Sequence, residues 1–161
     1  MSRTASAAIL AQISKAARDD PEKMGADWVP VLQGVPLFAN LSQRHLRHVA
    51  RLARAARFSA GAPVVRAGAP GDSFFVVIDG NARVEWSGGS SRLGPLDFFG
   101  EMSLIDGGPR SATVVAETEM LTMKLSRSAF AKVLESEPDI ALVIMKELVR
   151  RVRQAEGSPT A

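Results

Sequence analysis

The chain has 161 residues, 46% of them hydrophobic, and carries a net charge of +3. This length supports one hydrophobic core with short additions, so we expect no second domain. The absence of cysteine excludes disulfides and thiolate metal sites, and without a signal peptide or a long apolar run we expect a cytoplasmic protein.

The charges are distributed unevenly along the chain. Residues 36–66 contain six arginines and no acid, whereas residues 67–126 contain four basic and eight acidic residues. The sequence leaves two interpretations open: the two parts attract each other, or the charge directs the molecule onto an acidic partner.

Residues 1–35 form a predicted N-terminal helical arm. Apolar residues such as Ile9 and Ile13 recur at helical spacing and predict an amphipathic helix over residues 2–18 that stops before Pro21. The apolar residues that follow favour a packed arm of short helical turns. We expect the arm to cover one flank of the domain, and a signal-transmitting or dimerising helix is the alternative.

A second helix is predicted over residues 43–53, with Ser42 as its N-cap. Four arginines share one of its faces: Arg44, Arg47, Arg51 and Arg54. This face is either solvated or a docking surface for an acidic protein or nucleic acid. Because no aromatic side chain lies among these arginines to stack on bases, the nucleic-acid version is the weaker one.

His45 and His48 lie on the same predicted helix. They are the only histidines of the chain, and their segment contains no acid. We therefore expect them at the surface or at its boundary, and not as metal ligands.

Short strands separated by glycine-containing turns follow Phe58. The predicted strands are residues 63–66, 73–79, 82–87, 90–93, 111–116 and 120–125. Evenly spaced short strands indicate an antiparallel sandwich or barrel. We assign Phe75, Val77, Val84 and Trp86 to the core or to a pocket wall.

Two helices are predicted after these strands. The first contains Phe130 and is capped by Ser126 or Ser128, and the second begins at Pro138 and runs to about residue 155. The second helix carries a coiled-coil-like stripe of Ala141, Met145, Leu148, Val152 and Ala155. We expect this stripe to pack on its own domain, because barely two heptads are short for a stable dimer, and we expect a monomer or weak dimer.

Residues 97–116 have the features of an anion-binding site. Gly100 lets the backbone approach a ligand, and a short helical turn behind it presents N–H groups to negative charge. A tight turn over residues 106–109 directs Arg110 back toward Gly100, where its guanidinium fits two phosphate oxygens. Glu101 would repel a phosphate unless a ribose hydroxyl lay between them. Together Glu101 and Arg110 indicate a ribonucleotide whose phosphate lies close to its own sugar, as in a cyclic 3′,5′-phosphate.

These residues resemble the phosphate-binding cassette of the cyclic-nucleotide-binding domain family. The match covers residues 99–105 and 108–114 at the family's spacing, and the resemblance extends from about residue 37 to about residue 155. It implies a mainly β fold with flanking helices (α+β): an antiparallel jelly-roll β-barrel over residues 36–156 with N-terminal helices and a C-terminal helical lid. Residues 157–161 are then a tail.

The resemblance also implies which residues bind the ligand. The cyclic phosphate and ribose site comprises Phe99, Gly100, Glu101, Met102, Ser103, Arg110, Ser111 and Ala112. In this site Glu101 binds the ribose, whereas Arg110 and the Ser111 hydroxyl bind the phosphate. Arg151, near the end of the last helix, is the candidate residue that covers the base as part of the lid.

We therefore expect a cytoplasmic receptor for a cyclic nucleotide that moves its terminal helices on binding and so regulates a protein partner. Cyclic AMP is favoured over cyclic GMP, because Ser111 lies where cyclic-GMP-selective channels of the family tend to carry threonine. We expect no metal, cofactor or membrane contact. The nucleotide preference, the partner, the oligomeric state and the direction of the response stay open.

Three other functions compete with this interpretation. An enzyme is not expected, because the motif contains neither a metal-ligand set nor a general base. Sequence-specific DNA binding is not expected without a helix-turn-helix, so a DNA-associated regulator would need another means of contact. A nucleotide-independent scaffold is the remaining alternative.

Overall fold

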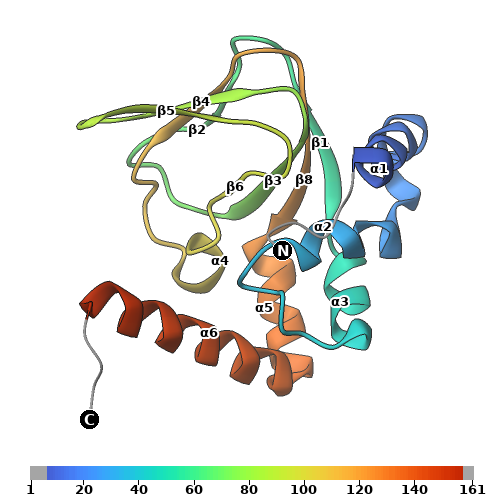
Figure 1. Ribbon diagram of the computed structural model, residues 1–161, viewed down its shortest axis with the longest axis vertical. Helices are drawn as coiled ribbons and strands as arrows, with labels where there is room; N and C mark the ends of the chain where they lie inside the picture. Colours follow the sequence, from blue (N-terminus) through green and yellow to red (C-terminus); the bar gives the residue numbers. More distant parts are fainter. Residues whose placement is uncertain (1–6, 158–161) are drawn as a thin grey trace.

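The computed structural model describes residues 7–157, so the predicted helix start at residues 2–6 and the tail residues 158–161 lie outside the described part. Two four-stranded antiparallel sheets form a β-sandwich, and the helices gather along one side and one end of it (Figure 1). This arrangement confirms the predicted jelly roll with flanking helices.

The two sheets differ in how deeply they are buried. The first has the order β1-β8-β3-β6, with β1 (Arg54–Phe58), β8 (Met120–Ser126), β3 (Ser73–Asp79) and β6 (Phe98–Phe99). The second has the order β2-β7-β4-β5, with β2 (Pro63–Val65), β7 (Thr113–Ala116), β4 (Ala82–Trp86) and β5 (Gly89–Leu93). Residues 73–78 of β3 are all buried, so both faces of this strand are covered. In contrast, β5 is almost fully exposed.

The N-terminal arm is helical and shares the core of the first sheet. It consists of α1 (Ala7–Asp19), η1 (Pro21–Lys23), η2 (Gly25–Trp28) and α2 (Val29–Gln33). The side chains of Trp28 and Leu32 are fully buried in the same cluster as Phe74 of β3. The first helix stops before Pro21, and short helical turns follow it, as the sequence predicts.

Three further helices, α3 (Gln43–Ala50), α5 (Arg127–Ser136) and α6 (Pro138–Glu156), close one end of the sandwich. The hydroxyls of Ser42 and Ser126 accept hydrogen bonds from the N–H groups of His45 and Ala129, at 3.1 and 3.2 Å. Both predicted N-caps are therefore confirmed. The fully buried Phe130 of α5 meets Phe38 edge to face, with ring centroids 5.8 Å apart.

The predicted end of the second helix is wrong. α3 stops at Ala50, and Arg54–Phe58 forms strand β1, which pairs with β8. The β1 sequence Arg-Ala-Ala-Arg-Phe contains no β-branched residue, so its local pattern does not indicate a strand. The segment forms a strand because it pairs with β8.

The expected packing of the stripe on α6 is only partly confirmed: Leu148 packs against the core, but Met145, Val152 and Ala155 are exposed. Ile140, Ile144 and Glu147 face the domain, whereas Met145 and Val152 are 54% and 57% exposed. Both sets of residues recur at spacings of three and four, so periodicity does not distinguish them.

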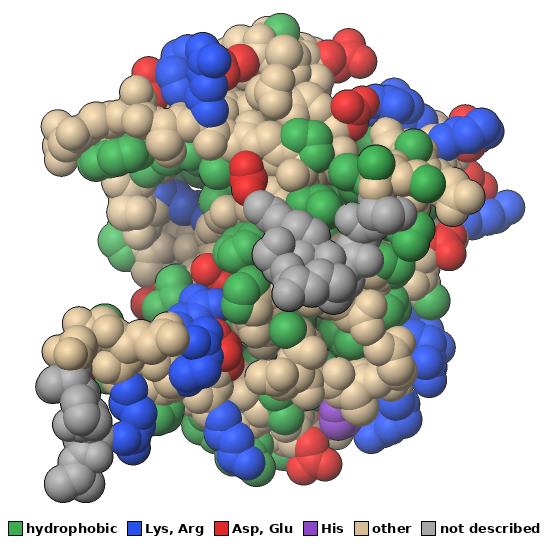
Figure 2. Space-filling view, in the orientation of Figure 1, with side chains coloured by type: hydrophobic (Ala, Val, Ile, Leu, Met, Phe, Trp, Pro, Cys, Tyr) green, Lys and Arg blue, Asp and Glu red, His purple; other side chains and the backbone are tan. Residues whose placement is uncertain are grey.

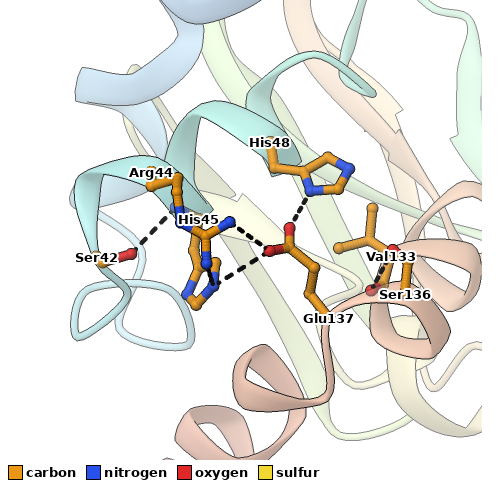
Figure 3. Close-up of polar contacts among 7 residues, drawn as sticks. All are labelled: Ser42, Arg44, His45, His48, Val133, Ser136 and Glu137. Carbon is orange, nitrogen blue, oxygen red and sulfur yellow. Dashed lines mark hydrogen bonds and ion pairs between the residues drawn. The ribbon is translucent and has the colours of Figure 1, made fainter.

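A charged cluster joins α3 to the start of α6 (Figure 3). The carboxylate of Glu137 accepts a hydrogen bond of 2.7 Å from Arg44, forms another with Nδ1 of His48, and lies 3.4 Å from Nε2 of His45. The hydrogen bonds from His48 and Arg44 hold the pKa of Glu137 below its ordinary value. His45 is buried, whereas the sequence predicts a position at the surface or its boundary; His48 is half-buried, as predicted. The acid that both histidines face, Glu137, comes from a distant part of the chain.

The aromatic contact between α5 and the core yields a prediction about stability. Phe130→Ala removes a fully buried ring, and we expect it to lower the free energy of unfolding by about 3–5 kcal/mol in urea titration. Val149→Ala, at an exposed position of α6, is the control and should change it by less than about 0.5 kcal/mol. A loss below about 1 kcal/mol for Phe130→Ala would contradict the packing described here.

Candidate ligand-binding site

A cavity of about 400 Å³ lies between the second sheet and the segment that joins β6 to β7. Figure 2 shows a hollow on this side of the molecule, between the β4–β5 hairpin and α6. Residues 99–103 and 108–112 form one wall of the cavity, and Val65, Val84 and Val114 form an apolar wall. All eight residues predicted for the phosphate and ribose line this cavity: Phe99, Gly100, Glu101, Met102, Ser103, Arg110, Ser111 and Ala112.

Arg110 is the buried cation of the cavity, with a side chain only 6% exposed. Its guanidinium donates one hydrogen bond to the carbonyl oxygen of Ser73, at 2.7 Å, and a longer one to the hydroxyl of Ser103, at 3.4 Å. Burial lowers the pKa of Arg110, and the carboxylate of Asp72, 3.9 Å away, opposes this shift. An arginine keeps its proton in proteins, so the remaining guanidinium N–H groups are available to an anion.

Gly100 fits closely against this guanidinium. Its φ of +85° lies in the left-handed region, and a Cβ there would collide with Nη1 of Arg110 and lie 2.8 Å from the carbonyl oxygen of Ser73. Glycine is therefore required for two independent reasons, its backbone angle and its contact with Arg110.

The turn between Gly100 and Arg110 has the predicted form. The short helix α4 (Ser103–Asp106) ends at Gly107, where φ is +64°, and the carboxylate of Asp106 accepts a hydrogen bond of 2.8 Å from the N–H of Gly108. This hydrogen bond stabilises the reversal of the chain, because the side-chain carboxylate of Asp106 acts as the acceptor in place of a backbone carbonyl. The turn brings Arg110 back beside Gly100.

Glu101 lines the same cavity, at the start of the segment that ends with Arg110. Its side chain is 17% exposed, and Oε2 accepts a hydrogen bond of 3.1 Å from Nη2 of Arg151. The predicted lid residue Arg151 therefore binds the carboxylate of Glu101, the residue predicted to bind the ribose, and does not itself line the cavity.

Glu147 of α6 orients Arg151. Its buried carboxylate accepts hydrogen bonds from Nε of Arg151, at 3.0 Å, and from two nitrogens of Arg150, at 2.7 and 2.9 Å. The hydrogen bonds from Arg150 and then Arg151 lower the pKa of Glu147 against the opposite effect of burial. Burial lowers the pKa of Arg151, but its bonds to Glu101 and Glu147 outweigh this, and the net shift is upward.

Sequence reasoning missed several residues that build the site. Ser73 contributes its backbone carbonyl oxygen, a group that every residue has and that no sequence pattern indicates. Glu147 contacts Arg151 from α6, which is far in sequence from the predicted cavity segment.

Val84 forms part of the cavity wall, one of the two roles predicted for it, because alternate residues of β4 face the same side. Phe75 and Val77 are core residues, whereas Trp86 is 45% exposed and does not line the cavity, so neither predicted role fits it.

Within residues 7–157, no three His, Cys, Asp or Glu side chains are arranged to hold a metal ion. In the same part of the chain, no helix has the length and apolar character needed to cross a membrane.

Comparison with known proteins identifies one family. Residues 55–137 match the family model of the cyclic nucleotide-binding domain. A cyclic nucleotide-gated potassium channel of Mesorhizobium japonicum is 40% identical over 121 residues, which are 75% of this chain and 34% of the channel. A cAMP-dependent protein kinase regulatory subunit of Aspergillus fumigatus is 37% identical over 114 residues, 68% of this chain and 27% of that protein. The chain thus matches between about a quarter and a third of the length of these curated relatives.

Solved structures agree with this match. The N-terminal domain of a transcriptional regulator from Streptomyces coelicolor superposes with a TM-score of 0.71 at 28% identity, covering 81% of this chain and 98% of that domain. The catabolite activator protein of Thermus thermophilus gives a TM-score of 0.61 at 30% identity, covering 76% of this chain and 60% of that one.

The contact between Gly100 and Arg110 predicts an unequal response to two alanine substitutions. Gly61 has the same φ of +85° as Gly100, but open space surrounds the position of its Cβ. Gly61→Ala should therefore show only the backbone cost, about 1–2 kcal/mol in urea unfolding. We expect Gly100→Ala to cost at least about 1 kcal/mol more, because the methyl group displaces the buried guanidinium. Equal losses would show that the contact with Arg110 contributes nothing.

The depressed pKa of Glu147 predicts a pH-dependent stability. A carboxyl group whose pKa is lower when folded stabilises the protein above its unfolded pKa, near 4.5, and loses this contribution as the pH falls through the folded value. Glu147→Gln should lower the free energy of unfolding at pH 7 by about 1–2 kcal/mol, and the difference should shrink toward about pH 3. Glu156→Gln, exposed on the same helix, is the control. A difference from wild type that stays constant between these pH values would contradict the assignment.

Proposed function

The chain belongs to the cyclic nucleotide-binding domain family, and on this premise we propose that it is a cytoplasmic receptor for cyclic AMP or cyclic GMP. One observation carries the proposal. A buried guanidinium and a half-buried carboxylate, Arg110 and Glu101, line the same cavity.

The cyclic phosphate would bind at Arg110. Hydrogen bonds to Ser73 and Ser103 hold the guanidinium in place, so its orientation is set before an anion arrives. Ser111 lines the cavity next to Arg110 and is placed to donate its hydroxyl to a second phosphate oxygen. A preorganised and desolvated cation binds a phosphate more strongly than an exposed one does.

The ribose and the base would occupy the rest of the cavity. Glu101 is an acceptor for the ribose 2′-hydroxyl, which a phosphate alone would not need. Val65, Val84 and Val114 offer an apolar wall to the base. We favour cyclic AMP over cyclic GMP, because the family resemblance associates threonine at the position of Ser111 with cyclic GMP selectivity.

Glu101 also supplies a physical link from the cavity to α6. Its carboxylate binds Arg151, so a ribose hydroxyl that binds Glu101 changes the electrostatic environment of this helix. Ligand binding and the position of α6 are then linked reciprocally. We propose that Arg151 and α6 act as the lid over the base and that their movement regulates a protein partner. The ligand-binding domain on this proposal comprises residues 36–156, with residues 1–35 as its arm.

The proposal places the protein among sensors and not among enzymes. Proteins with this domain are typically regulatory and non-catalytic.

Thermal unfolding with and without nucleotide tests this function. A ligand at about 100 times its Kd stabilises the folded state by about 2.7 kcal/mol, so cyclic AMP or cyclic GMP at about 1 mM should raise the Tm by roughly 5–10 °C. Arg110→Ala should abolish the shift, and Glu101→Gln should reduce it while leaving the fold intact. Side-by-side titration with the two nucleotides gives the preference.

Two controls accompany this measurement. Arg92→Ala removes an exposed arginine away from the cavity and should keep the full shift. Arg110→Lys keeps the positive charge but lacks the paired donors of a guanidinium, so it should bind the nucleotide more weakly than wild type. It provides a second test if Arg110→Ala fails to fold. Folded wild-type protein that shows no shift with either nucleotide would refute the proposed function.

A further inference from the structure

A second concave site lies at the helical end of the molecule, between α3 and α5. This groove has a volume of about 330 Å³ and shares no lining residue with the ligand cavity. Its floor is apolar, formed by Leu52, Ala129 and Val133. Its rim is polar, formed by His48, Ser128, Lys132 and Ser136. The volume lies within the range of pockets that bind small ligands or single side chains.

The edges of the groove are basic. Lys132 lies on the α5 side, and on the α3 side Arg44 and Arg51 flank His48 at spacings of four and three. No acidic side chain lines the groove. The site therefore combines an apolar floor with basic side chains at its edges.

Two of the basic side chains at this rim, Arg51 and Lys132, are not used in ion pairs among the described residues, and both are exposed. Arg44 and His48, in contrast, hold Glu137 (Figure 3). Glu137 therefore neutralises one end of the rim and leaves Arg51 and Lys132 available to an external acid.

An acidic peptide fits these features better than a nucleic acid does. A phosphate backbone would use the cations but not the apolar floor, and the groove has no aromatic side chain on which a base could stack. A peptide carboxylate pairs with either cation, and an aliphatic side chain beside it fills the floor.

We propose that this groove binds an acidic peptide segment of a partner protein. An aliphatic side chain of the segment inserts between Leu52 and Val133, and flanking carboxylates pair with Arg51 and Lys132. The groove lies outside the nucleotide cavity, so this binding does not depend on the proposed function.

Fluorescence anisotropy with a defined probe tests the proposal. The probe is a fluorescein-labelled peptide of six glutamates around a central leucine, titrated with the full chain at about 50 mM salt. We expect saturable binding, weakened at least about tenfold by Arg51→Glu or Lys132→Glu. Replacing the leucine of the probe by serine should also weaken binding about tenfold, because the apolar floor is then unfilled.

Lys15→Glu is the matched control, because it makes the same change in net charge at an exposed residue of α1. It should leave probe affinity within about twofold of wild type. An equal loss in Lys15→Glu would reduce the effect to net charge and overturn the proposal. Absence of binding to wild type, or equal affinity for the serine probe, would also overturn it.

Two further measurements place the binding site and its chemistry. In ¹⁵N spectra of the labelled protein, the peptide should shift the amides of Leu52, Ala129 and Lys132, and shifts confined to the nucleotide cavity would overturn the proposal. A DNA duplex of about 20 base pairs should bind more weakly than the leucine peptide. Tighter binding of DNA that depends on Arg51 and Lys132 would assign this surface to nucleic acid instead.

Discussion

The cavity depends on one buried guanidinium. An isolated charge inside a protein is strongly unfavourable, so Arg110 needs the hydrogen bonds that a backbone carbonyl of β3 and a hydroxyl of α4 accept, together with the nearby carboxylate of Asp72. The same requirement determines the residue next to it, because Gly100 leaves the space that the guanidinium fills. The side chain that holds these segments together therefore also supplies free donors for an anion. Fold and candidate site rest on the same contact.

Two carboxylates, those of Glu101 and Glu147, connect this cavity to the last helix, α6. Glu101 lines the cavity and accepts a hydrogen bond from Arg151. Glu147, one turn before Arg151 on α6, accepts a second hydrogen bond from the same guanidinium. A ligand group that replaces Arg151 as the hydrogen-bond partner of Glu101 therefore alters the interactions of α6. No long pathway is needed, since a single guanidinium lies between the ligand cavity and the helix.

The first turn of α6 is tied to another part of the protein. Glu137 precedes the helix and binds Arg44 and His48 of α3, next to the basic groove. The helix is thus attached near one end to the cavity and at the other to the α3–α5 surface. The outer face of α6, including Met145 and Val152, stays exposed.

The sequence determined the candidate site to a large extent, because residues 99–112 are close in the chain and local turn chemistry is enough to bring Glu101, Gly100 and Arg110 together. It also determined the N-caps of α3 and α5, which depend on side chains three residues from their partners. Only the tertiary structure decided the rest. The carbonyl of Ser73 has no sequence signature, the partners His48 and Glu137 are 89 residues apart, and β1 becomes a strand by pairing with β8. In each of these cases the contact joins segments distant in sequence, and their proximity is set by packing of the whole core.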